Sequence, residues 1–313
     1  MRVLVAPLNW GLGHAARCVP LIERLQAEGH EVVLGGAGES LALLRKRFPA
    51  LSVLPLAPLE LRYGKGKRQV TAMLCALPKI IRSARQDHVL LDEYLRYEQI
   101  DQVVSDNRFG LWSRKTHCVY MTHQLIVPLP RPWRWMEPLV ARWHRRVISR
   151  YDECWIPDEP THGLAGRLSH PAMLPPNAKY IGVLSRFAGK QYKADSTYQV
   201  VAVLSGLEPQ RTLLEQDICR RYEHTDKAVL IVRGKMHAPL TVVRNQMSGI
   251  TLVPWLDDSH LAAYLLGAER IICRSGYSSV MDMYALGVSA KVEWHPTPGQ
   301  PEQEYLSTLQ AKG

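Results

Sequence analysis

The stretch VLVAPLNWGLGHAARCVPLIERLQAEGHEVVL, residues 3–34, indicates the fold. It starts with a short apolar run at residues 3–7, passes through a turn-prone segment at residues 9–14, and continues with apolar side chains at helical spacing over residues 15–28. Gly29 ends the predicted helix, and a second apolar run follows at residues 31–34. Strand, glycine loop, helix and strand in this order predict a βαβ unit of a parallel sheet.

The same alternation continues along the chain and then starts again. In the first half, further strands are predicted at residues 51–54, 102–105, 117–121 and 153–156. A stretch rich in Gly, Lys and Asp follows at residues 189–196, and the second series then has predicted strands at 198–204, 228–233, 250–253 and 270–273. Its helices are predicted at about 211–222, 259–266 and 279–286. We therefore expect two α/β domains, residues 1–187 and 197–313, joined by a linker at residues 188–196.

The composition is that of a globular protein. With 313 residues, 46% of them hydrophobic and 22% charged, the chain can bury one large core or two ordinary ones. Its apolar runs are far shorter than the ~20 residues of a bilayer span, and the N-terminal run is too short for a signal peptide, which predicts a cytoplasmic location. The six cysteines form no CxxC pair, so we expect buried thiols rather than disulfides or a zinc site.

The net charge of +10 is concentrated in two basic stretches, residues 62–85 and 131–150. The second stretch mixes six arginines with Trp133, Trp135 and Trp143, and Pro138 allows a helix to start at Leu139. On that helix Arg142, Arg145, Arg146 and Arg150 would share one face, and Leu139, Trp143 and Val147 another. This composition fits a helix lying on an anionic membrane, whereas the alternative is a solvated face whose arginine stems cover the core. No motif for binding nucleic acid is present, so nucleic acid is not an expected partner.

Ligands of open parallel sheets bind outside the carboxyl ends of the strands, where helix N-termini present free N–H groups. The first such loop, Gly11-Leu12-Gly13-His14, has two small residues and an imidazole, although a tight turn into a helix is the alternative explanation. It does not match the dinucleotide fingerprint, because Ala16 takes the place of the third glycine.

The second half carries the sharper signal at residues 274–282, RSGYSSVMD, directly after a predicted strand. Its hydroxyls, glycine and helix start suit a phosphate, Arg274 adds charge, and Asp282 could bind two ribose hydroxyls. An ordinary capped helix is the alternative. Three more turns follow predicted strands in this half, at Ser205-Gly206, at residues 253–256 around Trp255, and at residues 297–303.

Taken in order, these turns resemble the donor-binding half of GT-B glycosyltransferases, especially relatives of the bacterial peptidoglycan N-acetylglucosaminyltransferase. The glycine loop with His14 resembles the acceptor half of the same fold. A group of uncharacterised predicted glycosyltransferases is more similar still, through WGLGHAARCVPLI, VVSDNRFG, MTHQL, YDECWIPD, LSGLEPQRT and PTPGQPEQEYL. The resemblance implies a GT-B fold, with two Rossmann-like parallel-sheet domains facing an interdomain cleft. It also implies an acceptor domain first, and a donor domain that is shortened at its C-terminus.

The resemblance also implies roles for single residues. Gly276 with Ser278 or Ser279 would approach the diphosphate. The residues expected to bind the nucleotide sugar also include Gly11, Gly13, Ser205, Gly206, Arg274 and Ser275. Arg186 would be a second diphosphate contact, and Asp282 would hold the ribose. Backbone groups around Trp255 would meet the uracil edge, and Glu302 and Gln303 would reach hydroxyls of the donor sugar.

The chemistry requires a base for the acceptor hydroxyl and stabilisation of the departing nucleoside diphosphate. The sequence has no Asp-x-Asp motif, so we expect a metal-independent enzyme in which N–H groups, a helix dipole and arginine stabilise the leaving group, with no cofactor. An imidazole titrates near neutral pH, which makes His14 the candidate base, with Asp106 to orient it and His123 as a competing candidate. The alternatives are that His14 caps its helix or touches phosphate, that Asp106 caps a turn, and that His123 is an acceptor contact or an interior histidine.

The sequence therefore predicts a glycosyltransferase that moves a sugar from a nucleotide sugar, UDP-linked such as UDP-N-acetylhexosamine, to an envelope glycan or a lipid-linked acceptor. The basic stretches predict a peripheral position on the inner face of the plasma membrane. Two alternatives stay open: a nucleotide-sugar hydrolase or 2-epimerase on the same fold, and a nucleotide-sugar-binding protein without turnover.

Overall fold

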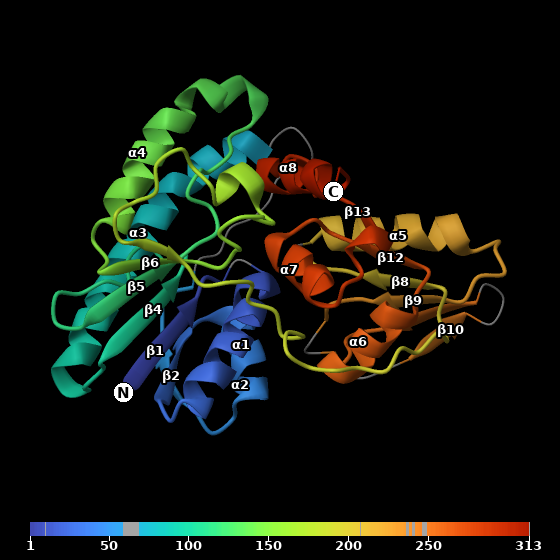
Figure 1. The fold of residues 1–313 in the computed structure, drawn as a ribbon, viewed down its shortest axis with the longest axis horizontal. Coiled ribbons are helices and arrows are strands. Elements are labelled where there is room, and N and C mark those ends of the chain that lie inside the picture. The colour runs from blue at the N-terminus through green and yellow to red at the C-terminus, as the bar shows by residue number, and fades with distance from the viewer. Residues whose placement is uncertain are drawn as a thin grey trace. The chain divides into compact units, whose positions relative to one another are not determined.

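The computed structural model describes residues 1–9, 11–58, 69–206, 208–235, 238–239, 242–245 and 249–312. They form two compact units (Figure 1). The first contains Met1–Leu184 and Gly299–Glu302, and the second contains Ser185–Pro298 and Gln303–Gly313. The first unit thus ends three residues before the predicted boundary, because Ser185 and Arg186 bond to Asp282 of the second unit.

The first unit is built on a seven-stranded parallel sheet with strand order β3-β2-β1-β4-β5-β6-β7. The strands are β1 (Arg2–Pro7), β2 (Glu31–Gly36), β3 (Ser52–Pro55), β4 (Gln102–Asp106), β5 (His117–Met121), β6 (Glu153–Ile156) and β7 (Ala178–Tyr180). The helices are α1 (Leu12–Ala27), α2 (Gly38–Arg47), α3 (Gln69–Tyr97) and α4 (Glu137–Ile148). α1 and α2 lie on one face of the sheet and α3 and α4 on the other (Figure 1).

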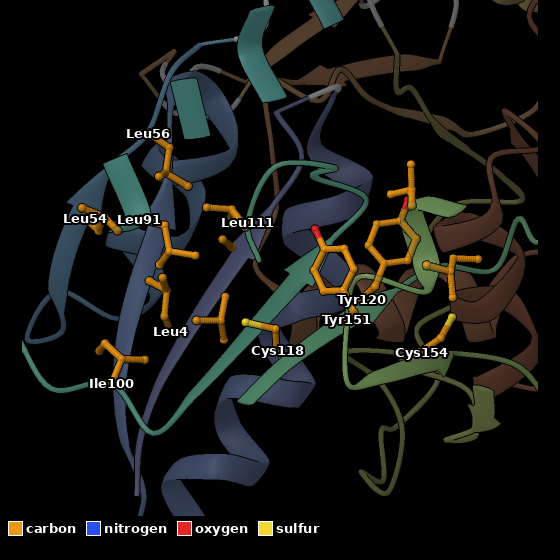
Figure 2. Packing of buried hydrophobic residues seen from close by; sticks show 14 of the residues in the cluster. Leu4, Leu54, Leu56, Leu91, Ile100, Leu111, Cys118, Tyr120, Tyr151 and Cys154 are labelled. Atoms are coloured by element: carbon orange, nitrogen blue, oxygen red, sulfur yellow. The ribbon is translucent and has the colours of Figure 1, made fainter. Parts of the chain in front are cut away.

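Burial explains why strands such as β1 could be predicted from the sequence, whereas β7, whose residues are half-buried or exposed, was not predicted. Residues 3–6 of β1 are fully buried, as expected for a parallel strand that helices cover on both faces. Figure 2 shows the core on the α3 side, where Leu4, Leu91 and Tyr120 belong to one cluster. Gly11 precedes α1 with a φ of 82°, a left-handed conformation that favours glycine.

The second unit is built on a six-stranded sheet with strand order β10-β11-β9-β8-β12-β13. Among the described strands of this sheet, β10 alone is antiparallel to its neighbour, and it lies at the sheet edge. The strands are β8 (Val200–Val203), β9 (Val229–Val232), β10 (Val243–Asn245), β11 (Ile250–Val253), β12 (Arg270–Cys273) and β13 (Val292–Trp294). The helices are α5 (Gln210–Tyr222), α6 (Asp258–Gly267), α7 (Tyr277–Ala285) and α8 (Pro301–Gln310). α5 packs on one face, and α6 and α7 pack on the other (Figure 1). Both sheets therefore confirm the predicted class, two Rossmann-like α/β units.

Within the second unit, the predicted linker is packed rather than extended. The backbone N–H of Asp195 donates to the carbonyl of Ala263 in α6 at 2.9 Å. The ring of Tyr192 lies edge-on to Phe187, with 6.0 Å between the ring centroids. The segment that joins the two series of strands is therefore part of the second unit.

The prediction that Leu139, Trp143 and Val147 share one face of the basic helix was wrong. α4 starts at Glu137, and its Val147 is buried, whereas Leu139 is 59% exposed and Trp143 is 45% exposed. Leu139 and Trp143 share the exposed face of α4 with Arg142 and Arg146, because Arg142, Trp143 and Arg146 lie three, four and seven residues after Leu139. The short helix before α4, η2 (Arg131–Met136), adds Trp135, which is 70% exposed. In the other basic stretch, residues 62–68 and the side chains of residues 69–77 lie outside the described part of the chain.

No helix of the described residues is long and apolar enough to cross a membrane.

Candidate functional site

The predicted catalytic residues of the first unit lie together at the carboxyl edge of its sheet. β1 pairs with β4, with Pro7 opposite Asp106, and β4 pairs with β5, with Asp106 opposite Met121. His14 lies in the first turn of α1, directly after β1, and His123 follows two residues after β5. Three neighbouring strands thus bring the three side chains to one place.

Arg17, which the sequence analysis did not single out, connects all three of these residues. Its Nε donates to Oδ2 of Asp106 at 2.8 Å, and its Nη2 donates to Oδ1 of the same carboxylate. Nη2 also lies 2.8 Å from Nδ1 of His14, and Nη1 lies 3.1 Å from Nδ1 of His123. Nδ1 of His14 is 3.1 Å from Oδ2 of Asp106. The signal for Arg17 was its position three residues after His14, which places both on one side of the helix.

The carboxylate of Asp106 is fully buried, yet it is ionised. Burial by itself raises its pKa, but the charges and hydrogen bonds of Arg17 and His14 more than offset this and lower the pKa to about 2. Asp106 raises the pKa of Arg17 in return, against the opposing effect of burial. The pair is therefore a buried ion pair in which both charges are compensated.

Both ring nitrogens of His123 have a partner. Nδ1 faces the Arg17 guanidinium, which only donates, and Nε2 lies 2.9 Å from Oε1 of Glu302, in the segment Gly299–Glu302 of the same unit. Burial lowers the pKa of His123, so the ring is neutral, accepts at Nδ1 and donates at Nε2. A ring in this state has no lone pair left to accept a proton from an acceptor hydroxyl, which weakens His123 as the base.

In the second unit, the open part of the predicted donor site is the start of α7. Gly276 is the N-cap of this helix, and an added Cβ there would meet no heavy atom of the described residues within 4 Å. Ser278 and Ser279 in the first turn are half-buried. β8 pairs with β12, with Val203 opposite Cys273, so Ser205 and Gly206 follow the neighbouring strand. Gly206 is exposed, with a φ of 92°. Glycines and serines therefore lie at the helix start and after the neighbouring strand.

The charged residues predicted for this site are buried and bonded within the unit. Arg274 donates from Nη1 to the carbonyl of Pro296 at 3.0 Å and from Nη2 to the carbonyl of Gln210 at 2.6 Å. Ser275 donates to the carbonyl of Gln303 at 2.8 Å. As placed, both Nη atoms of Arg274 and the hydroxyl of Ser275 support neighbouring loops, whereas the buried Nε of Arg274 has no hydrogen-bond partner among the described residues. The predicted diphosphate contact of Arg274 and Ser275 stays a prediction.

Asp282 and Arg186 are bonded to each other. Oδ1 of Asp282 accepts from Ser185 Oγ at 2.7 Å, and Oδ2 accepts from Arg186 Nε at 3.2 Å. Arg186 Nη1 also donates to Asp258 at 3.2 Å. Burial raises the pKa of Asp282, although Arg186 and Ser185 oppose this effect. The two predicted ligand residues thus bind each other across the unit.

The remaining predicted residues also have partners within the second unit. Oε1 of Gln303 accepts from the backbone N–H of Thr297 at 2.8 Å. The indole N–H of Trp255 donates to the carbonyl of Ala238 at 3.3 Å. In the first unit, Ser40 of α2 donates to the carbonyl of Gly11 at 3.1 Å and so fixes the glycine loop before His14.

Comparison with known proteins places this geometry in a known fold. No protein-family model matches the chain. The chain is 24% identical over 339 residues to an uncharacterized glycosyltransferase of Methanosarcina acetivorans, covering 99% of this chain and 81% of that protein. A second uncharacterized glycosyltransferase of that organism is 22% identical, covering 97% of this chain and 82% of that protein.

Solved glycosyltransferase structures are similar over almost the whole chain. Phytolacca americana UGT2, complexed with UDP-2fluoro-glucose and pterostilbene, has a TM-score of 0.61 and 14% identity, covering 100% of this chain and 83% of that one. Acinetobacter baumannii MurG has a TM-score of 0.51 and 13% identity, covering 99% and 83%. The chain has the GT-B fold. This confirms the predicted resemblance, and the enzyme class expected from the sequence is the one named for the relatives.

A third similar structure belongs to a protein named for a different enzyme class. The structure of a putative UDP-N-acetylglucosamine 2-epimerase from Listeria monocytogenes has a TM-score of 0.55 and 13% identity, covering 100% of this chain and 88% of that one. The GT-B fold by itself therefore does not separate transfer from epimerisation.

Within the described residues of this GT-B chain, no group of three or more His, Cys, Asp or Glu side chains is placed to hold a metal ion. Metal independence was predicted from the sequence and stays a prediction.

Proposed function

We propose that this GT-B protein transfers a sugar from a nucleoside-diphosphate sugar, UDP-linked, to a hydroxyl of its acceptor. The observation that carries the proposal is the open start of α7, where Gly276 leaves room beside the first N–H groups of the helix. A helix start binds anions through free N–H groups and the positive end of its dipole. Ser278, Ser279 and the Ser205-Gly206 turn add hydroxyls and N–H groups on the same sheet edge.

The first unit supplies the base in this proposal. Nε2 of His14 takes the proton of the acceptor hydroxyl, while the hydroxyl oxygen forms a bond to the anomeric carbon. The bond from that carbon to the diphosphate oxygen breaks, and the nucleoside diphosphate leaves with the electron pair. Asp106 orients the ring by accepting from the Nδ1–H of His14, across the 3.1 Å between these atoms.

The charge on the leaving group is stabilised mainly by N–H groups of α7 in this proposal. Arg274 and Arg186 contribute indirectly, because their donors hold Pro296, Gln210, Asp258 and Asp282. The predicted roles of Asp282 at the ribose, of Trp255 at the base, and of Glu302 and Gln303 at the donor sugar are kept as parts of the same proposal.

Acceptor-dependent release of UDP tests the function. UDP-sugars are supplied with and without glycan and polyprenyl-phosphate-linked acceptors, and released UDP is measured together with the glycosylated product. We expect His14→Ala to lower kcat by about 100-fold or more with the Kd for UDP unchanged, since a positioned base contributes about 10²–10⁴. Equal losses of kcat and UDP affinity would demote His14 to a donor contact.

The second candidate function is a nucleotide-sugar hydrolase or 2-epimerase, which the similarity to the putative 2-epimerase structure favours. Such an enzyme releases UDP from the donor, or forms the epimeric sugar, without any acceptor. UDP release or epimer formation that does not depend on added acceptor would replace the transferase proposal with this one. UDP binding with neither reaction would favour a binding protein without turnover.

For the acceptor, we propose a lipid-linked envelope glycan reached from the inner face of the plasma membrane. The support is the exposed face of η2 and α4, where Trp135, Leu139 and Trp143 lie among exposed arginines, namely Arg131, Arg134, Arg142, Arg145, Arg146 and Arg150. Arginines attract anionic headgroups, and tryptophans sit at the headgroup level of a bilayer.

Cosedimentation with vesicles tests this surface. We expect binding to vesicles of phosphatidylglycerol and phosphatidylcholine but not of phosphatidylcholine alone, weakened by salt. Arg142→Glu/Arg146→Glu on α4 should abolish it, whereas Arg45→Glu/Lys46→Glu on α2, the same change in charge on the opposite face of the sheet, should leave it intact. Equal loss in both variants, or no sedimentation of the wild type, would remove the membrane from the proposal.

A further inference from the structure

Arg17 has no part in the proposed chemistry so far, yet its guanidinium contacts three side chains of the candidate site. It lies in α1, is only 3% exposed, and directs its donors at Asp106, His14 and His123. A guanidinium donates hydrogen bonds, never accepts them, and keeps its proton in proteins. An imidazole nitrogen that bonds to Arg17 must therefore be unprotonated.

This rule determines the state of His123 but leaves two states for His14. Nδ1 of His14 lies 2.8 Å from a donor, Nη2 of Arg17, and 3.1 Å from an acceptor, Oδ2 of Asp106. A lone pair on Nδ1 satisfies Arg17 and puts the proton on Nε2. A proton on Nδ1 satisfies Asp106 and leaves the lone pair on Nε2, which is the only state in which Nε2 can take a proton.

The charges around His14 are balanced through Arg17. The groups that face this ring are Arg17 and Asp106, and behind them lie Cys18, His123 and Glu302. A buried carboxylate next to an imidazole favours the protonated ring, and a guanidinium disfavours it. Because Arg17 and Asp106 bind each other, neither charge acts alone on the ring.

We propose that Arg17 is a positioning residue that decides, in competition with Asp106, which nitrogen of His14 carries the proton. Its charge also opposes protonation of both nitrogens, the state in which His14 cannot act as a base. For catalysis this inference rests on the proposed function, in which His14 is that base. The predicted proton positions of His14 and His123 rest only on the hydrogen-bond geometry around Arg17.

Nitrogen-15 NMR of histidine-labelled wild-type protein tests the geometry without any activity. We expect His123 to carry its proton on Nε2 and a lone pair on Nδ1 at neutral pH. We expect the proton of His14 to shift towards Nδ1 in Arg17→Gln, where the competing donor charge is gone. A proton on Nδ1 of His123, or an unchanged His14 pattern in Arg17→Gln, would overturn the proposal. The wild-type spectrum decides even if the variant fails to fold.

The pH dependence of kcat/KM provides the catalytic readout. Removing the cation in Arg17→Gln should move the acid limb to higher pH, and removing the anion in Asp106→Asn should move it to lower pH, each by about one pH unit. Arg24→Gln, the same change at an exposed position of α1, should leave the profile unchanged. A uniform loss of rate without opposite displacements would show a purely structural role. If the protein has no transfer activity, the NMR experiment still tests the predicted proton positions of His14 and His123.

Discussion

Replacing Gly276 by alanine should separate donor binding from folding. The residue has φ −72° and ψ 143°, which alanine adopts without strain, and its added methyl group would meet no described heavy atom within 4 Å. The reduced freedom of the unfolded chain stabilises the protein by about 0.4–1 kcal/mol. Alanine is a poorer N-cap than glycine by about 0.5–1 kcal/mol. The free energy of unfolding should therefore change by less than about 1 kcal/mol.

Donor binding should respond quite differently, because the methyl group fills the space beside the N–H groups that hold the diphosphate in our proposal. Loss of one hydrogen bond to a charged group costs about 1.5–3 kcal/mol. This corresponds to a rise of about 10- to 100-fold in the Kd for UDP. Urea unfolding gives the stability, and isothermal titration calorimetry with UDP gives the affinity.

Gly267→Ala is the matched control with the opposite pattern. A Cβ at this position would lie 2.1 Å from the carbonyl oxygen of Asp195, and backbone cannot give way by that much. We expect a clear loss of stability and, at a temperature where the variant is folded, wild-type affinity for UDP. An unchanged UDP affinity in Gly276→Ala would refute the diphosphate site at α7, and a strongly destabilised Gly276→Ala would refute the open space beside it.

Three further predictions follow from buried charges and the glycine loop. Arg108 donates to Asp87 at 2.8 and 3.0 Å, and both side chains are buried. Arg108→Leu leaves the Asp87 charge without its partner and should lower the free energy of unfolding by about 3–5 kcal/mol. Arg108→Leu/Asp87→Leu removes both charges and should lower it less, which chemical denaturation measures. The pKa of Asp106 is lowered from 3.8 to about 2, so its stabilising contribution of about 2 kcal/mol is complete above pH 4 and is lost as pH falls towards 2. The stability difference between wild type and Asp106→Asn should shrink over that interval, and a constant difference would contradict the assignment. Gly11→Ala, which puts a side chain at φ 82°, should destabilise the protein by on the order of 1–2 kcal/mol in thermal unfolding, whereas no loss would mean that the loop before His14 relaxes.

The central strands could be predicted because a parallel strand covered by helices on both faces is a short apolar run, as in β1 and β9, whereas the short edge strands β7, β10 and β13 were not predicted. β13 was harder to predict from the sequence, because Val292–Trp294 is flanked and interrupted by the polar residues Lys291, Glu293 and His295. It lies at the edge of the second sheet, where Glu293 accepts from Arg221 and from Arg270. An edge strand can carry such charges, and sequence pattern alone does not tell edge from centre.

The site was predicted only in part, because burial of a charged residue depends on partners far away in the sequence. Arg17 and Asp106 are 89 residues apart, and the parallel pairing of β1 with β4 brings them together. Likewise, the predicted faces of α4 grouped Leu139 with Val147, whereas Val147 is buried and Leu139 is exposed beside arginines. Apolar character alone therefore did not predict which residues of this helix pack against the sheet.

The second unit shows why charged residues near a predicted ligand site need not touch the ligand. A loop after a strand has carbonyl and N–H groups of its own to satisfy before it can be rigid. Arg274 donates to the carbonyls of His295, Pro296 and Gln210, and the side-chain oxygen of Gln303 accepts from the backbone N–H of Thr297. Their bonds hold the loops around α7 in place, and the small residues are left at the surface. An anion site built in this way relies on fixed backbone dipoles, which need no rearrangement when charge develops on a leaving group.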